Sequence, residues 1–282
     1  MMTDSPENVD NQPTQLPPPP VPPGPAVGLL TDIGRVRTEN QDTVFATCTV
    51  LEFAGTVETA GLYIVADGMG GHKQGAQASQ AAVRAAAAHI LQNIYLPELY
   101  HNPAEPAAPP LNELLVQAVE TANTAVRKAA PEGGTTLTAV VMLGHSAYIA
   151  HVGDSRAYLF KEGVLKQITT DHSLARRMEE LGHVSSGKPA ESRNVLYRAL
   201  GQSDTVEVDI HFQNIPHAAS LVLCSDGLWG AVHQPDMEAI LQQAATPQEA
   251  CQRLVNKANE NGGEDNISVI IVTMGEGAPS TG

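Results

Sequence analysis

The sequence predicts an α+β protein in which β-sheets pack together and helices cover them. Strand-like segments follow one another in hairpin succession and helical segments come in pairs, so the regular alternation of a βαβ fold is absent. Of the 282 residues, 42% are hydrophobic, which is enough apolar material for one large domain or two small ones.

The predicted strands are rich in Val, Ile, Tyr and Thr and are bounded by Gly, Asp or Asn. They cover residues 44–53, 61–66, 138–143, 147–152, 157–160, 206–212, 220–224 and 267–273. The predicted helices cover residues 75–94, 111–129, 173–181, 235–243 and 247–261. In the second helix the apolar residues recur at the spacing of a single buried face. For the helix that begins at Leu174, Ser173 or Asp171 is expected to be the N-cap.

The two ends of the chain differ from this body. Residues 1–27 hold 9 of the 20 prolines and no Lys or Arg, and LPPPPVPPGP at 16–25 favours polyproline II. We therefore predict that residues 1–26 are a disordered spacer, with a ligand for a proline-recognising domain as the alternative. Residues 27–274 are predicted to form the folded domain, and residues 275–282 a frayed C-terminus.

The charge and the cysteines exclude several classes of protein. With 16 basic and 31 acidic side chains, the net charge of −15 argues against a nucleic-acid binder. No apolar run is long enough to span a membrane, and the N-terminus lacks the pattern of a signal peptide. Cys48, Cys224 and Cys251 are too widely spaced for a disulfide framework or a zinc site, which indicates a cytoplasmic protein. Cys224 lies in an apolar strand and is expected to be a core thiol.

Four aspartates lie next to apolar strands, in glycine-containing turns. They are Asp67, Asp154, Asp226 and Asp265. If they converge at one end of a sheet, their burial requires cations, and ligands that are all oxygen select Mg²⁺ or Mn²⁺. A glycine after an aspartate also lets a backbone carbonyl join the metal shell. Taken singly, each of these motifs is better explained as an ordinary turn, and only their repetition beside four apolar strands favours a metal site.

Together with TDIGRVRTENQD at residues 31–42, these turns make the chain similar to the metal-dependent Ser/Thr protein phosphatases of type 2C, in their compact bacterial form. The other matching segments are VADGMGGH at 65–72, GGTTLTAV at 133–140, HVGDSRAY at 151–158, TTDHS at 169–173, LYRALG at 196–201, LCSDGLWG at 223–230 and GGEDNISVI at 262–270. The resemblance covers about residues 27–274, which makes this segment the phosphatase domain. It implies a four-layer α-β-β-α sandwich with two central antiparallel sheets flanked by helices.

The resemblance also implies a metal centre of two core Mn²⁺ or Mg²⁺ ions, with a third ion as an option. The implied ligands are Asp67 as the bridging carboxylate, the carbonyl of Gly68, Asp226 and Asp265 for the first ion, Asp42 through water for the second, and Asp154 for a third, weaker ion. Arg37 matches the arginine that binds the substrate phosphate.

Two segments depart from the family pattern. Animal members carry a histidine after the Asp-Gly pair, whereas this chain has Met69. His72 follows closely, either as the proton donor or as an exposed turn residue. Residues 174–194 correspond to the family's flap, but they lack the usual His-Pro pair.

The predicted function is hydrolysis of phosphoserine and phosphothreonine in proteins by a metal-bridged hydroxide, which reverses Ser/Thr kinase signalling. The predicted partners are a Ser/Thr kinase and its phosphorylated targets, and the enzyme is expected to be a monomer. We expect Thr135 and Thr136 to support the site and Trp229 to belong to the core. The alternatives are a partner-switching phosphatase of sigma-factor regulators, an unrelated hydrolase of small phosphoesters, and a catalytically silent phosphoprotein-binding module. A silent module is expected to lack one of the core aspartates, and this chain has them all.

Overall fold

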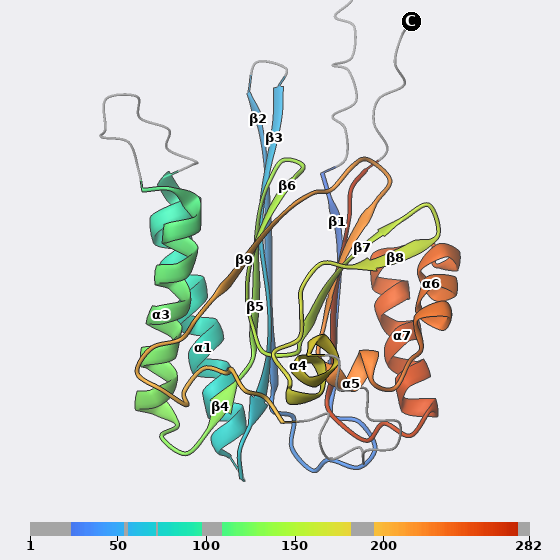
Figure 1. The fold of residues 1–282 in the computed structure, drawn as a ribbon. Coiled ribbons are helices and arrows are strands. Elements are labelled where there is room, and N and C mark those ends of the chain that lie inside the picture. The colour runs from blue at the N-terminus through green and yellow to red at the C-terminus, as the bar shows by residue number, and fades with distance from the viewer. Residues whose placement is uncertain (1–23, 54–55, 72, 98–108, 182–194, 276–282) are drawn as a thin grey trace, which may run out of the picture.

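Two antiparallel sheets lie face to face between two layers of helices in the computed structural model, which describes residues 24–53, 56–71, 73–97, 109–181 and 195–275 (Figure 1). This arrangement confirms the predicted four-layer sandwich. Within the described ranges, no helix has the length and apolar character needed to cross a membrane.

One sheet has six strands in the order β2-β3-β5-β6-β9, with β4 paired to β3 outside that path. Its strands are β2 (Asp42–Phe53), β3 (Thr56–Met69), β4 (Gly134–Thr135), β5 (Leu137–Leu143), β6 (Ser146–Val152) and β9 (Asp209–Asn214). The second sheet has five strands in the order β1-β11-β10-β7-β8. They are β1 (Ala26–Asp32), β7 (Arg156–Lys161), β8 (Val164–Gln167), β10 (Ser220–Cys224) and β11 (Ile267–Thr273).

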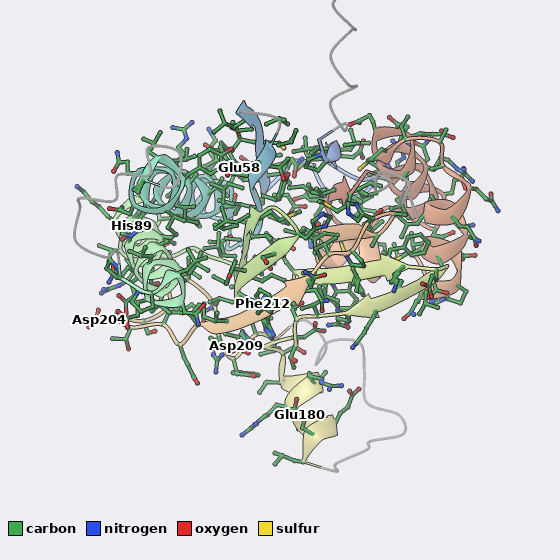
Figure 2. The ribbon with its side chains drawn as sticks, turned by 90° about the horizontal axis from the view of Figure 1, so that it is seen from above. Glu58, His89, Glu180, Asp204, Asp209 and Phe212 are labelled. Atoms are coloured by element: carbon green, nitrogen blue, oxygen red, sulfur yellow. The ribbon has the colours of Figure 1, made fainter. Side chains whose placement is uncertain are left out.

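The helices cover the two outer faces. On the six-stranded sheet lie α1 (Gln74–Ile90), which continues into a π-helical turn (Leu91–Tyr95), and α3 (Leu111–Ala129). On the five-stranded sheet lie α6 (Gln234–Gln243) and α7 (Pro247–Glu260), and α5 (Asp226–Trp229) is a single turn at the sheet's end. From above, α4 (Leu174–Glu180) stands out from the body, with Glu180 at its end (Figure 2).

Three buried apolar clusters correspond to the three interfaces between these four layers. The first lies between α1, α3 and the six-stranded sheet, the second between the five-stranded sheet and α5–α7, and the third between the sheets. The buried residues of α3 include Leu115, Val119 and Val126, so its predicted apolar face is the packed one. Cys224 is fully buried in the second cluster, as expected.

Side-chain caps fix the starts of two helices. The Thr246 side chain accepts a hydrogen bond from the Glu249 amide at 3.1 Å, and Glu249 Oε2 accepts one from the Ala245 amide at 3.0 Å. Such reciprocal capping satisfies amides that have no partner within the helix. Ser173 accepts from the Arg176 amide at 3.3 Å, which confirms it as the N-cap of α4.

Several elements differ from the expectation. The strands β1, β4 and β8 and the helix α5 were not predicted, and β9 starts at Asp209 instead of residue 206. The strand β1 contains Gly28 at a position where no side chain fits. A Cβ there would lie 2.3 Å from the backbone of Pro247. The glycine therefore lets α7 pack closely on β1. In addition, β3 extends to Met69, so Asp67 lies within a strand and not in a turn.

Candidate metal centre

A cavity of about 250 Å³ lies at the end of the sandwich where β3 finishes. Six of the residues singled out in the sequence line it: Arg37, Asp67, Gly68, Asp154, Asp226 and Asp265. They come from five separate segments of the chain, and the fold brings them together. The other lining residues are Gln41, Met69, Gly70, Thr136 and Leu196, and of these Thr136 was expected to support the site.

The pairing of β2 with β3 places Asp42 directly opposite Asp67. Asp42 is 8% exposed and is not among the residues that line the cavity, so it lies behind it. One of its oxygens, Oδ2, accepts a hydrogen bond from the Ser225 hydroxyl at 2.8 Å. Because Ser225 immediately precedes Asp226 at the start of α5, this bond links the two sheets at the cavity.

The backbone of Asp67 is held by the two threonines that precede β5. The Asp67 amide donates to Thr136 Oγ1 at 2.9 Å, and the Thr136 amide donates back to the Asp67 carbonyl at 2.9 Å. Thr135 Oγ1 donates to the same carbonyl at 2.8 Å. Both threonines are buried, and they support the site as expected.

Gly68 occupies a position where no side chain fits. A Cβ there would lie 2.2 Å from the carbonyl oxygen of Gly75 and 2.7 Å from that of Gln41. The Gly68 amide donates to that Gln41 carbonyl at 3.1 Å. The glycine therefore allows the start of α1 and the end of the 33–41 loop to approach the strand end.

The 33–41 loop, which carries Arg37, is fixed by Asn266. Asn266 Oδ1 accepts from the Gln41 amide at 2.8 Å, and its Nδ2 donates to the carbonyls of Ile33 and Glu39 at 2.9 and 3.0 Å. Asn266 is 4% exposed. It was missed in the sequence, although its position directly after Asp265 in the GGEDN turn was a usable signal.

Arg37 points to the cavity and forms an ion pair with Asp265. Arg37 Nη2 lies 2.7 Å from Asp265 Oδ2, with the two side chains 53% and 32% exposed. The hydrogen bond to Asp265 raises the pKa of the guanidinium. Among the described residues that line the cavity, Arg37 is the one cation against four carboxylates.

Burial raises the pKa of several of these carboxyl groups. Burial is the largest cause for Asp42 and for Asp154, and it raises the pKa of each to about 7. The pKa of Asp67 is raised well above its ordinary value, and that of Asp226 is raised as well, first by burial and then by neighbouring carboxylates. Without a cation, the site therefore favours protonated carboxyls.

The donor atoms fit a hard divalent cation. Asp42 Oδ1 and Asp226 Oδ1 are buried and have no hydrogen-bond partner. A buried carboxylate oxygen without a partner is unfavourable, and a cation would supply one. Over the described part of the chain, no three His, Cys, Asp or Glu side chains form a ready-made metal shell. In this arrangement Asp265 is paired with Arg37, and Asp42 Oδ2 is bonded to Ser225.

His72 and residues 182–194 of the flap segment lie outside the described residues. Met69 lines the cavity in the place where animal members have a histidine. Trp229 is only partly buried, so the expectation that it is a core residue is incomplete; its indole nitrogen donates to the carbonyl of Asp154 at 3.0 Å.

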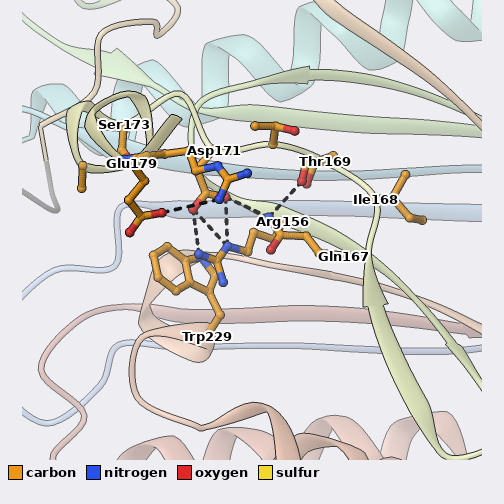
Figure 3. A pocket seen from close by; sticks show the side chains of 11 residues that line it. Arg156, Gln167, Ile168, Thr169, Asp171, Ser173, Glu179 and Trp229 are labelled. Carbon is orange, nitrogen blue, oxygen red and sulfur yellow. Dashed lines mark hydrogen bonds and ion pairs between the residues drawn. The ribbon is translucent and has the colours of Figure 1, made fainter. Parts of the chain in front are cut away.

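A second cavity, of about 460 Å³, lies beside α4 and is larger than the first. Its acidic residues Asp171 and Glu179 form ion pairs with Arg156 and Arg176, as Figure 3 shows. Because its carboxylates are already paired, this cavity lacks the surplus negative charge that a divalent cation requires.

Comparisons with known proteins find similar sequences over most of this chain. The sequence profile of the family described as protein phosphatase 2C matches residues 35–260. The serine/threonine phosphatase stp of Listeria monocytogenes is 36% identical over 253 residues, which cover 86% of this chain and 93% of that protein.

Solved structures agree. The serine/threonine phosphatase of S. agalactiae superposes with a TM-score of 0.70 at 30% identity, over 89% of this chain and 99% of that one. The catalytic domain of the serine threonine protein phosphatase PstP, in complex with two manganese ions, gives a TM-score of 0.70 at 29% identity, over 90% and 99% of the two chains.

Proposed function

Because this chain belongs to the protein phosphatase 2C family and is a metal-dependent protein serine/threonine phosphatase, we propose that the cavity between Asp67 and Asp226 is its active site. One observation carries the proposal. Four carboxylates line a single cavity, a fifth lies directly behind it, and two of their buried oxygens have no partner. Such a concentration of negative charge at one end of a sandwich is unfavourable unless cations bind there.

The chain's own residues would divide the cations between them. Asp67, the Gly68 carbonyl, Asp226 and Asp265 would hold a first ion, and Asp42 with Asp67 a second; Asp154 would hold a third. When bound, Mn²⁺ or Mg²⁺ supplies a hydroxide nucleophile at neutral pH and stabilises charge on the phosphoryl group. The hydrogen bonds that Asp67 makes with Thr135 and Thr136 fix its backbone, and so the point from which its carboxylate would reach the cations.

Arg37 would orient the substrate. Its guanidinium is half-exposed at the cavity, and its planar fork can contact two phosphate oxygens at once. Its bond to Asp265 would be exchanged for the phosphate when Asp265 turns to a cation. We also propose His72 as the proton donor to the leaving oxygen, since Met69 in the cavity has no proton to donate.

The substrates, the compartment and the oligomeric state are also proposals. We propose that the substrates are a Ser/Thr kinase and its phosphorylated targets, and that the enzyme acts as a cytoplasmic monomer. The acidic charge and the three free cysteines are consistent with a reducing compartment and with substrates other than nucleic acids. We further propose residues 1–26 as a tail outside the phosphatase domain of residues 27–274.

The test is hydrolysis of a phosphothreonine peptide by enzyme that has been freed of metal with a chelator. Activity should be absent, should return with Mn²⁺ or Mg²⁺, and should fall at least about tenfold in Asp67→Asn because a cation ligand is lost. Asp236→Asn, an exposed aspartate on α6, is the matched control and should have wild-type activity. A wild-type rate in Asp67→Asn would refute the site, and a preference for small phosphate esters over the peptide would refute the substrate class.

A further inference from the structure

The loop that carries Asp154 crosses from one sheet to the other. It follows β6, which ends at Val152 in the six-stranded sheet, and it leads into β7, which begins at Arg156 in the five-stranded sheet. Strand pairing therefore fixes the two ends of the loop but not Asp154 itself. Contacts from other segments must determine where its carboxylate lies.

Trp229 makes one of these contacts. Its indole Nε1–H donates to the Asp154 carbonyl at 3.0 Å. Trp229 is the last residue of α5, the single turn that begins with Asp226. One short helical turn therefore both carries the Asp226 carboxylate and holds the backbone of Asp154, which connects two carboxylates that line the same cavity.

The orientation of the indole ring is itself fixed by an ion pair (Figure 3). The Arg156 guanidinium lies 3.5 Å from the centroid of the Trp229 ring. The same guanidinium group donates two hydrogen bonds to the Asp171 carboxylate, from Nε to Oδ1 at 2.9 Å and from Nη2 to Oδ2 at 2.7 Å. The Arg156 and Asp171 side chains are only 22% and 8% exposed, so the pair is well shielded from water.

His172, the residue after Asp171, also holds the crossover loop. The His172 amide donates to the Gly153 carbonyl at 2.8 Å, and the Gly153 amide donates to His172 Nδ1 at 3.0 Å. Gly153 has a φ of +112°, a conformation that favours glycine. The crossover loop is therefore held at two adjacent residues. Gly153 makes two hydrogen bonds to His172, and the Asp154 carbonyl accepts one from Trp229.

We propose that Trp229 is a positioning residue that couples Asp154 to Asp226, and that cation binding by Asp154 depends on its indole N–H. This inference rests on the proposed function, because it assumes that cations bind among these carboxylates. The Arg156–Asp171 ion pair holds the ring in the orientation that makes the bond. Loss of the indole N–H leaves the Asp154 carbonyl without this partner and the crossover loop free to shift.

The test measures metal binding directly, by calorimetric titration of metal-free full-length enzyme with Mn²⁺. Trp229→Phe keeps an aromatic ring and removes the N–H. It should weaken the weaker phase of binding by about tenfold, the effect expected for one lost hydrogen bond, while the tight phase is unchanged. Asp154→Ala should lose the same phase, which assigns that phase to Asp154. The control Tyr148→Phe alters an aromatic residue of β6 and should bind as the wild type does.

Each outcome decides a different claim. If Trp229→Phe binds Mn²⁺ as the wild type does, the coupling is refuted and the proposed function stands. If the wild type binds no cation, both are refuted.

A spectroscopic measurement covers the case in which Trp229→Phe does not fold. Trp229 is the sole tryptophan of the 282 residues, so tryptophan emission from the native protein reports on the surroundings of this one ring. In a Mg²⁺ titration the emission should change during the weaker phase in wild type and not in Asp154→Ala. Unchanged emission in the wild type would overturn the proposal.

Discussion

Replacing Asp42 by asparagine should stabilise the metal-free protein while it weakens metal binding. The Asp42 carboxyl is 8% exposed, and burial raises its pKa from 3.8 to about 7. A shift of this size corresponds to about 4 kcal/mol for holding the charged form in the folded chain. Asparagine removes the charge, keeps the shape, and still offers Oδ1 to the Ser225 hydroxyl that now donates to the carboxylate at 2.8 Å.

The pH dependence gives the prediction its sign. A carboxyl whose pKa is raised on folding stabilises the protein when it is protonated, and that contribution is lost as the pH rises through about 7. The advantage of Asp42→Asn should therefore be greatest near pH 8, at about 4 kcal/mol, and should fall to about half near pH 5.5, where the wild-type carboxyl takes up its proton. Histidines with lowered pKa, such as His151, also titrate in this range, but they contribute equally to both proteins.

Urea unfolding of both proteins in excess chelator, at the two pH values, measures this difference. With saturating Mn²⁺ the order should reverse at about pH 8, because only the wild type gains the full free energy of metal binding. Asp236→Asn serves again as the control, since its side chain is exposed and it should show neither effect. A variant that is less stable than the wild type in chelator at about pH 8 would refute the idea that Asp42 is an uncompensated buried charge.

Three further predictions follow from other parts of the structure. Arg37→Ala should raise the KM for a phosphopeptide by about tenfold and change kcat less, because its charge meets the phosphate before reaction; an unchanged KM would remove Arg37 from the site. Asn266→Ala should lower the free energy of unfolding by about 2–3 kcal/mol, since three partly buried backbone groups of the 33–41 loop lose their partner, and a loss below about 0.5 kcal/mol in urea would contradict this role. Deleting residues 1–23, which precede β1, should leave Tm and kcat/KM unchanged, whereas a lower Tm would show that the proline-rich segment packs on the domain.

Much of the cavity could be predicted from local signals. Asp67 and Asp226 follow apolar strands and each precedes a glycine, and Asp265 lies between a Gly-Gly pair and an apolar strand, so these features are visible over a few residues. The position of Asp42 behind the cavity depends on strand register. Phe53 pairs with Thr56, and counting back along the hairpin places Asp42 opposite Asp67. A short connection between two strands was therefore a usable signal for this pair.

The contacts of Asp154 and Asn266 could not be predicted in the same way. Asp154 bonds to Trp229 across 75 positions of sequence, and Asn266 bonds to the 33–41 loop across more than 220. Such contacts depend on how the two sheets stack, and hydrophobic periodicity does not carry that information. For the same reason the sequence predicts Trp229 to be an apolar core residue, whereas in the structure its indole N–H bonds to the loop that carries Asp154.

The division of the cavity's carboxylates between the sheets has a mechanical consequence. Asp67 belongs to β3 in one sheet, whereas Asp226 and Asp265 flank β10 and β11 in the other. A cation shared among them acts as a cross-link at one rim of the sandwich, while the apolar cluster between the sheets holds the remainder. The rim should therefore loosen before the body when the cation leaves, and its amide protons should exchange faster there than in the middle of β11. Cation affinity and the rigidity of this rim are then linked, so a substitution that stiffens the rim also tightens metal binding.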